Sequence, residues 1–173
     1  MKLPNDFMKQ MCLLLGEKNY EEFITSLQMQ PSSVSIRLNE FRKPDETLFQ
    51  TGTSKLTRKV PWCASGYYIN RRPTFTFDPL FHAGCYYVQE ASSMFLEQVI
   101  KHYVQEPVVM LDLCAAPGGK STHTQSLLPE GSLLVANEIV RNRAHILSEN
   151  ITKWGHPDVV VTNNAPEDFA PLD

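Results

Sequence analysis

The segment "VVMLDLCAAPGGKST", residues 108–122, contains the strongest pattern in the chain. An apolar run is followed by small residues, a proline, two adjacent glycines and a lysine. A continuous apolar run of this kind is typical of a strand in a sheet that is covered on both faces. The glycines permit a tight strand-to-helix loop and the close approach of a ligand. The pattern therefore predicts a strand, a loop that binds an anionic group, and a helix.

The residues after this loop predict an alternation of helices and strands. Helices are expected over 119–128 and 140–155, and apolar strands over 133–138 and 157–163. Alternation at this spacing implies parallel strands joined by right-handed crossovers. We therefore expect an α/β fold built on a parallel sheet.

The residues before the loop show a mixed pattern. Apolar residues at helical spacing and strand-like alternation predict the following elements: a helix over 3–16 ended by Gly16, a helix over 19–29 ended by Pro31, a strand over 33–39, short strands and loops over 40–80, and a helix between Glu90 and Pro107. We expect two domains, a small α+β domain over 1–80 and a second domain over 81–173.

The composition is that of an ordinary soluble protein, with 42% hydrophobic and 20% charged residues in a chain of 173. The sequence has neither a signal-peptide pattern nor an apolar run long enough to span a membrane, so a cytoplasmic protein is expected. The four cysteines and five histidines show no ligand spacing. We therefore expect no disulfide framework and no metal site.

Charge is distributed unevenly along the chain. The net charge is −3, but residues 37–72 hold eight basic and three acidic side chains. Aromatic residues are interleaved with arginines at the end of this stretch, in Tyr67, Tyr68, Arg71, Arg72, Phe75 and Phe77. This basic segment suits RNA, on which aromatic rings stack and cations pair with phosphates. A solvated face explains the charges equally well, and a non-catalytic RNA-binding module is an alternative function.

Three classes of ligand are candidates for the loop over 114–120. A nucleotide-binding P-loop requires glycine where Cys114 stands, and Pro117 lacks the N–H that such a loop uses. A dinucleotide loop requires G-x-G-x-x-G, which is absent. The only anionic group of S-adenosylmethionine is a carboxylate, and its ribose needs an acidic acceptor at the end of the second strand. Glu138 occupies that place, although it also suits the start of the following helix.

Other polar residues near the loop have two interpretations each. Asp112 either fixes the loop together with the amino end of the cofactor or only accepts hydrogen bonds from loop amides. Gln89, Glu90 and Ser92 either orient the methionine end of the cofactor or cap a helix.

"LDLCAAPGGKST" resembles the cofactor motif of the Nol/Nop/Sun family of RNA 5-methylcytosine methyltransferases, and "YYVQEASSM" resembles the segment that precedes it. The resemblance covers about residues 3–170. It implies a Rossmann-like, S-adenosylmethionine-dependent methyltransferase sheet, of which only the N-terminal half is expected here, and ribosomal RNA as the substrate. It also implies cofactor contacts from the loop residues Cys114, Ala115, Ala116, Pro117, Gly118, Gly119 and Lys120, from Glu138 and from Arg143, which braces it. The family's acidic residue near the adenine is replaced here by Ala165.

The chemistry expected of the family requires a cysteine thiolate that adds to C-6 of cytosine, so that C-5 can attack the methyl group. The family carries its functional cysteines in Pro-Cys and Thr-Cys motifs on later strands, and Cys114 is not the nucleophile. We therefore expect no catalytic residue in this chain, the nucleophile beyond Asp173, and no activity from the chain alone. An exposed first strand would then favour self-association.

Overall fold

The computed structural model describes residues 3–29, 33–49 and 54–170. The chain divides into two compact units between Ser33 and Val34. None of the helices described is long and apolar enough to cross a membrane.

The first unit is α1 (Asn5–Met29), which is two helices joined at Gly16. Gly16 has φ 74° and ψ 159°, a conformation that glycine adopts without strain. The rings of Phe7 and Phe23, one from each half, lie with centroids 6.3 Å apart. The two helices expected over 3–16 and 19–29, and the break at Gly16, are therefore confirmed. Pro31 lies outside the described residues.

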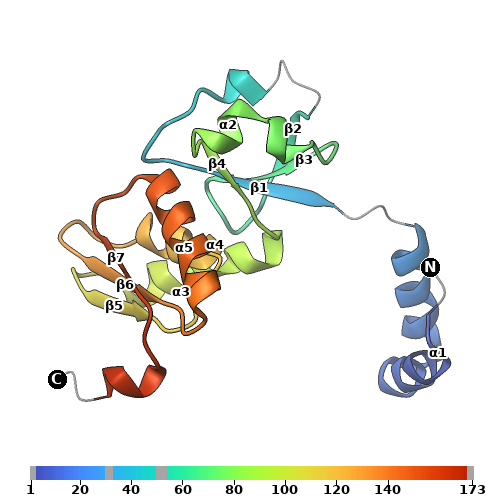
Figure 1. Ribbon diagram of the computed structural model, residues 1–173. Coiled ribbons are helices and arrows are strands. Elements are labelled where there is room, and N and C mark those ends of the chain that lie inside the picture. Colours follow the sequence, from blue (N-terminus) through green and yellow to red (C-terminus); the bar gives the residue numbers. More distant parts are fainter. Residues whose placement is uncertain (1–2, 30–32, 50–53, 171–173) are drawn as a thin grey trace. The chain divides into compact units, whose positions relative to one another are not determined.

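The second unit begins with an antiparallel sheet in the order β2-β3-β1-β4 (Figure 1). Its strands are β1 (Val34–Leu38), β2 (Leu56–Lys59), β3 (Gly66–Ile69) and β4 (Tyr86–Val88). Its core contains Ile36, Leu38, Phe49, Tyr67, Ile69 and Tyr86. The strand over 33–39 and the short strands of 40–80 are confirmed.

Short helical segments lie between the strands of this sheet and after its last strand. They are η1 (Glu46–Phe49), η2 (Phe75–Phe77), α2 (Pro79–His82), η3 (Ala91–Phe95) and α3 (Leu96–Tyr103). The helix expected between Glu90 and Pro107 thus begins as a 3-10 turn and ends earlier, at Tyr103. Met94 is fully buried, whereas Phe95, Val99 and Tyr103 are exposed.

A parallel sheet follows in the order β5-β6-β7, as expected. Its strands are β5 (Val109–Asp112), β6 (Leu133–Asn137) and β7 (Val159–Thr162), and its helices are α4 (Gly119–Gln125) and α5 (Arg141–Trp154), followed by η4 (Pro166–Phe169). Leu147 and Ile151 of α5 pack with Ala136 of β6 in its core. This alternation places the ends of β5 and β6 side by side, where the candidate site lies.

The expectation that the first strand is covered on both faces is wrong for β5. In the described part of the chain β5 pairs only with β6. Val109 and Leu111, which share one face of β5, are 76% and 40% exposed, so that face is not covered in the described residues. The apolar run correctly predicts a strand, but in these residues that strand is an edge.

The antiparallel sheet extends past residue 80, where the sequence suggested a domain boundary. β4 lies after residue 80 and pairs with β1. β1 to β7 all belong to one compact unit. The boundary at residue 80 stays a prediction.

Candidate functional site

Two glycines shape the loop between β5 and α4. Gly118 has φ 110°, and a Cβ added there would lie 3.3 Å from Cδ1 of Leu147. A Cβ at Gly119 would lie 3.2 Å from the ring of Tyr87 in β4. Any side chain at Gly118 would be strained, and one at Gly119 would push against the neighbouring sheet. The glycines therefore permit both the turn and the close approach of β4.

Side chains from two other elements hold the carbonyl groups of this loop. The Ala116 carbonyl accepts a hydrogen bond of 2.9 Å from Nη2 of Arg143. The Pro117 carbonyl accepts from the Tyr87 hydroxyl at 3.1 Å and from Nδ2 of Asn150 at 2.7 Å. These bonds fix the backbone of the loop before any ligand arrives, which lowers the entropy cost of binding.

Asp112, at the end of β5, binds the loop itself. Its Oδ1 accepts from the Cys114 N–H at 3.3 Å, and its Oδ2 accepts from the Ser121 hydroxyl at 2.8 Å. This is the loop-fixing role that the sequence allowed. A contact with the amino end of a cofactor stays a prediction.

Arg37 of β1 is fully buried and reaches the same loop. Its Nε donates to Oε1 of Gln89 at 2.9 Å, and its Nη2 donates to the Thr122 hydroxyl at 2.7 Å and the Gly119 carbonyl at 3.3 Å. Its guanidinium carbon lies 4.5 Å from the centroid of the Trp154 ring. Burial lowers the pKa of Arg37 to about 10, so the side chain stays charged at neutral pH.

Arg37 therefore does not belong to a surface that RNA can reach, and its inclusion in the basic segment over 37–72 is wrong for this residue. The alternation of β1 turned Arg37 away from the core of the antiparallel sheet. What the sequence did not show is that α4 and α5 cover that second face.

A cavity of about 240 Å³ lies where the loop meets the segment after β4. Its lining comes from two stretches: Tyr87, Val88, Gln89, Glu90 and Ser93 on one side, and Cys114, Ala115, Ala116, Pro117, Gly119 and Lys120 on the other. The two motifs singled out in the sequence are thus brought together, with Ser93 in place of Ser92. Nε2 of Gln89 is buried and has no hydrogen-bond partner among the described residues, so this donor can serve a ligand.

Glu138, directly after β6, is buried beside this cavity's loop but is not among its lining residues. Its Oε1 accepts from the Val140 N–H at 3.0 Å, and its Oε2 lies 3.3 Å from Nη1 of Arg143. Because Arg143 also holds the Ala116 carbonyl, one guanidinium connects the acidic residue to the loop. Oε2 is buried without a hydrogen bond. Binding of a ribose by Glu138 stays a prediction.

Ala165 directly precedes η4 and cannot replace the family's acidic side chain. Its N–H donates to Oδ2 of Asp168 at 3.1 Å, and Nδ2 of Asn164 donates to the same oxygen at 3.3 Å. The Asn164 carbonyl accepts from Asn137 at 3.0 Å. The polar groups around Ala165 are therefore engaged with one another, and an adenine contact there stays a prediction.

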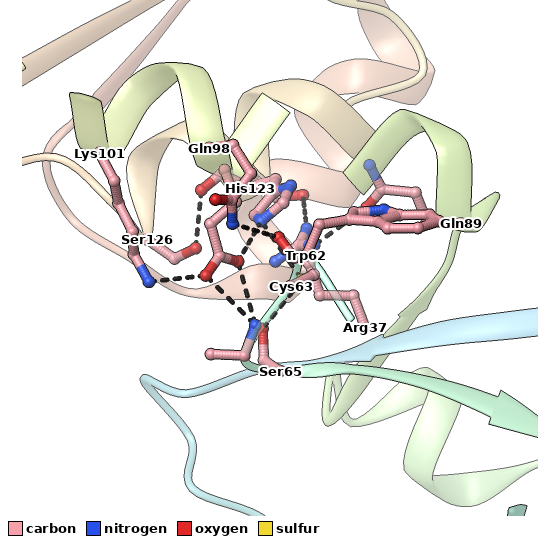
Figure 2. Close-up of polar contacts among 12 residues, drawn as sticks. Arg37, Trp62, Cys63, Ser65, Gln89, Gln98, Lys101, His123 and Ser126 are labelled. Carbon is pink, nitrogen blue, oxygen red and sulfur yellow. Dashed lines mark hydrogen bonds and ion pairs between the residues drawn. The ribbon is translucent and has the colours of Figure 1, made fainter. Parts of the chain in front are cut away.

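Sequence reasoning also missed a buried polar cluster to which α4 contributes one residue. Cys63, before β3, and His123, in α4, lie close together with Glu97 of α3, and all three are buried (Figure 2). No ligand spacing was visible among the cysteines and histidines of the sequence. Residues 63 and 123 are 60 positions apart, so spacing gives no signal.

A parallel sheet of this order, with a glycine-containing loop after its first strand, is the start of a Rossmann-like α/β domain. The family model for the N-terminal domain of 16S rRNA methyltransferase RsmF matches residues 3–91, and the model for 16S rRNA methyltransferase RsmB/F matches residues 99–169. The chain belongs to this RsmB/F family of ribosomal RNA methyltransferases.

Curated relatives agree with this assignment. The chain is 30% identical to ribosomal RNA small subunit methyltransferase F of Pectobacterium atrosepticum, over 93% of this chain and 34% of the relative. It is 32% identical to the enzyme of the same name from Erwinia tasmaniensis, over 97% of this chain and 36% of the relative. The chain thus spans about a third of the length of these relatives.

Solved structures share the fold. NSun6 from Pyrococcus horikoshii, solved with SFG, has a TM-score of 0.77 at 17% identity, over 98% of this chain and 67% of its own. A methyltransferase homolog protein from the same organism has a TM-score of 0.70 at 23% identity, over 94% of this chain and 57% of its own. These likenesses confirm the expected α/β methyltransferase fold.

Proposed function

We propose that this chain is the cofactor-binding, N-terminal part of an enzyme that methylates C-5 of a cytosine in ribosomal RNA with S-adenosylmethionine. The observation that carries the proposal is the cavity between the loop over 114–120 and the segment over 87–93. The family supports a methyltransferase that acts on ribosomal RNA. An enzyme with this substrate would work in the cytoplasm.

The residues present fit S-adenosylmethionine. The buried and unpartnered amide of Gln89 is a donor suited to the carboxylate at the methionine end of the cofactor. Glu138 is an acceptor suited to the ribose hydroxyls, and Arg143 keeps its carboxylate in place. The role of the chain's own residues is to hold these groups in fixed positions, while the cofactor supplies an electrophilic methyl group.

None of the cysteines in the second unit is well suited to act as the nucleophile at C-6. Burial raises the pKa of Cys63 to about 11, so its thiol stays protonated at neutral pH. Burial also raises the pKa of Cys85. Cys114 is exposed, but it belongs to the cofactor loop, where the family does not use it for attack. These observations support a chain that binds the cofactor and does not transfer the methyl group.

The expected result is therefore binding without transfer. By calorimetry, the chain should bind S-adenosylmethionine and not ATP. Incubated with labelled cofactor and unmodified ribosomal RNA, it should give no labelled 5-methylcytosine. Methyl transfer by the chain that disappears in Cys114→Ser would refute the proposal that the chain binds the cofactor without transferring its methyl group. Tight ATP binding would favour nucleotide hydrolysis instead.

A second observation supports RNA as the partner. Arg58 and Lys59 of β2 are exposed, and their cationic groups lie 4.3 and 5.4 Å from the ring centroids of Tyr68 and Tyr67. Such a row of cations can pair with phosphates. It is also the observation that favours the alternative function, a non-catalytic RNA-binding module.

We also propose that the 173-residue chain self-associates through β5. The exposed Val109 and Leu111 lie on a strand whose outer edge has no partner in the described part of the chain. Sedimentation should show dimers or larger species, and Leu111→Lys should shift the population toward monomer. Ile146→Lys, which changes an exposed apolar residue of α5 outside the strand edges, is the matched control and should leave the distribution unchanged. A chain that is monomeric at high concentration would contradict this expectation.

A further inference from the structure

Three side chains of the metal-ligating type converge at a buried point that the proposed reaction does not use. Cys63 comes from the turn between β2 and β3, Glu97 from α3 and His123 from α4. Nε2 of His123 lies 3.6 Å from Sγ of Cys63 and 3.2 Å from Oε2 of Glu97. The three ligand atoms all lie within 4.8 Å of one another. Figure 2 draws Cys63 and His123 within one network of polar contacts.

Hydrogen bonds to Glu97 link Cys63 and His123, but they leave Nδ1 of His123 without a partner. A neutral imidazole nitrogen offers either one N–H or one lone pair, whereas Nε2 of His123 has two partners. Burial lowers the pKa of His123 to about 4, so the ring is neutral at pH 7 and has a lone pair to give. Cys63, Glu97 and His123 are each at most 2% exposed. A cation at the centre would be bound by all three side chains at once.

The distances agree with a tetrahedral ion. With Zn–S of about 2.3 Å and Zn–N of about 2.0–2.1 Å, tetrahedral angles separate sulfur and nitrogen by about 3.6 Å and nitrogen and oxygen by about 3.4 Å. The corresponding separations here are 3.6 and 3.2 Å. Three protein ligands leave a fourth position for water.

The surroundings also orient the ligands. The Ala64 N–H donates to both oxygens of Glu97, at 3.2 and 3.3 Å, and Nζ of Lys101 lies 2.6 Å from Oε1. Burial alone would raise the pKa of Glu97, but these hydrogen bonds lower it to about 2, so the carboxylate is charged. The ring nitrogen Nδ1 of His123 is buried without a hydrogen bond, and an ion on Nε2 leaves the proton there. The bonds between the ion and its ligands must outweigh the free-energy cost of this buried, unpaired N–H group.

We propose that Cys63, Glu97 and His123 form a binding site for a single Zn²⁺ ion. On binding, the Cys63 thiol releases its proton to solvent and the thiolate, the carboxylate and the imidazole coordinate the ion. The ion ties the turn before β3 to α3 and to α4. Because α4 begins at Gly119 of the cofactor loop, the site also stabilises the end of that loop.

Cobalt is the probe, because a tetrahedral Co²⁺–thiolate site has a near-ultraviolet charge-transfer band and visible absorption. The chain, reduced and freed of metal by a chelator, should give both bands on titration with Co²⁺, saturating at a single ion per chain. Zn²⁺ should displace the bands and raise the Tm. No bands at saturating Co²⁺ would overturn the proposal.

Variants assign the ligands. Cys63→Ser should abolish the charge-transfer band. Glu97→Gln should weaken Co²⁺ binding by roughly tenfold or more, because the loss of a residue that only supports a metal ligand already costs about 10–100-fold in affinity. Cys114→Ser, at an exposed thiol, is the matched control and should keep the band. If Cys63→Ser fails to fold, His123→Gln replaces it, with circular dichroism as the check on folding. A band that survives Cys63→Ser or vanishes in Cys114→Ser would refute the site.

Discussion

Replacing Arg37 by Ala should lower the free energy of unfolding by about 3 kcal/mol or more, the range expected when buried polar groups lose their partner. The change leaves the Oε1 atom of Gln89 without its donor, removes hydrogen bonds to Thr122 and Gly119, and opens a cavity beside Trp154. Each orphaned buried group costs about 1–3 kcal/mol. Urea unfolding monitored by tryptophan fluorescence measures the effect.

Two further variants separate the causes. Arg58→Ala removes an exposed arginine that also lies over an aromatic ring, so it should cost about 1 kcal/mol or less. Arg37→Met keeps most of the volume and removes the hydrogen bonds, so it isolates the polar contribution. Equal effects of Arg37→Ala and Arg58→Ala would contradict the role of Arg37 as a buried connection between β1 and the cofactor loop.

Arg37 also marks the limit of strand periodicity as a guide to burial. The alternation of Val34, Ile36 and Leu38 correctly predicted β1 and its core face. Periodicity says which side chains share a face, but it does not say whether the second face is covered. Here the second face carries Ser35 and Arg37, both buried, because later parts of the chain pack on it.

The parallel sheet was predictable because its signals are local. Each apolar strand from β5 to β7 and each helix between them has its own pattern, and their order along the chain fixes the parallel topology. β4 was missed because three residues are too few to show a period. The edge position of β5 was expected from the strand order that the resemblance implies, because a run of apolar residues alone does not say whether a neighbouring strand is present.

The candidate site divides in the same way. The loop over 114–120 and Glu138 lie at strand ends, where local sequence and sheet geometry place them. The carbonyl contacts from Arg143, Tyr87 and Asn150 join residues about 30 positions apart. The cluster of Cys63, Glu97 and His123 depends on the packing of three elements, so its members become neighbours only in the folded chain.

Replacing Glu138 by Ala should raise the Kd for S-adenosylmethionine by roughly tenfold or more. A hydrogen bond to a charged group contributes about 1.5–3 kcal/mol, and about 1.4 kcal/mol corresponds to a factor of ten. The buried Oε2 atom of Glu138 has no hydrogen bond to give up before a ribose hydroxyl donates to it. Calorimetric titration of the chain with S-adenosylmethionine measures the change.

Controls must separate cofactor binding from folding, because Glu138 also accepts from the Val140 N–H and pairs with Arg143 at the start of α5. Glu138→Gln keeps an acceptor for the Val140 N–H and removes the charge. It should therefore preserve the Tm of the chain while still weakening the binding of S-adenosylmethionine. Glu149→Ala, which removes an exposed carboxylate from the same helix, should leave the Kd unchanged. If Glu138→Ala binds as tightly as the parent chain, Glu138 serves only the start of α5, and the ribose must be held by another residue.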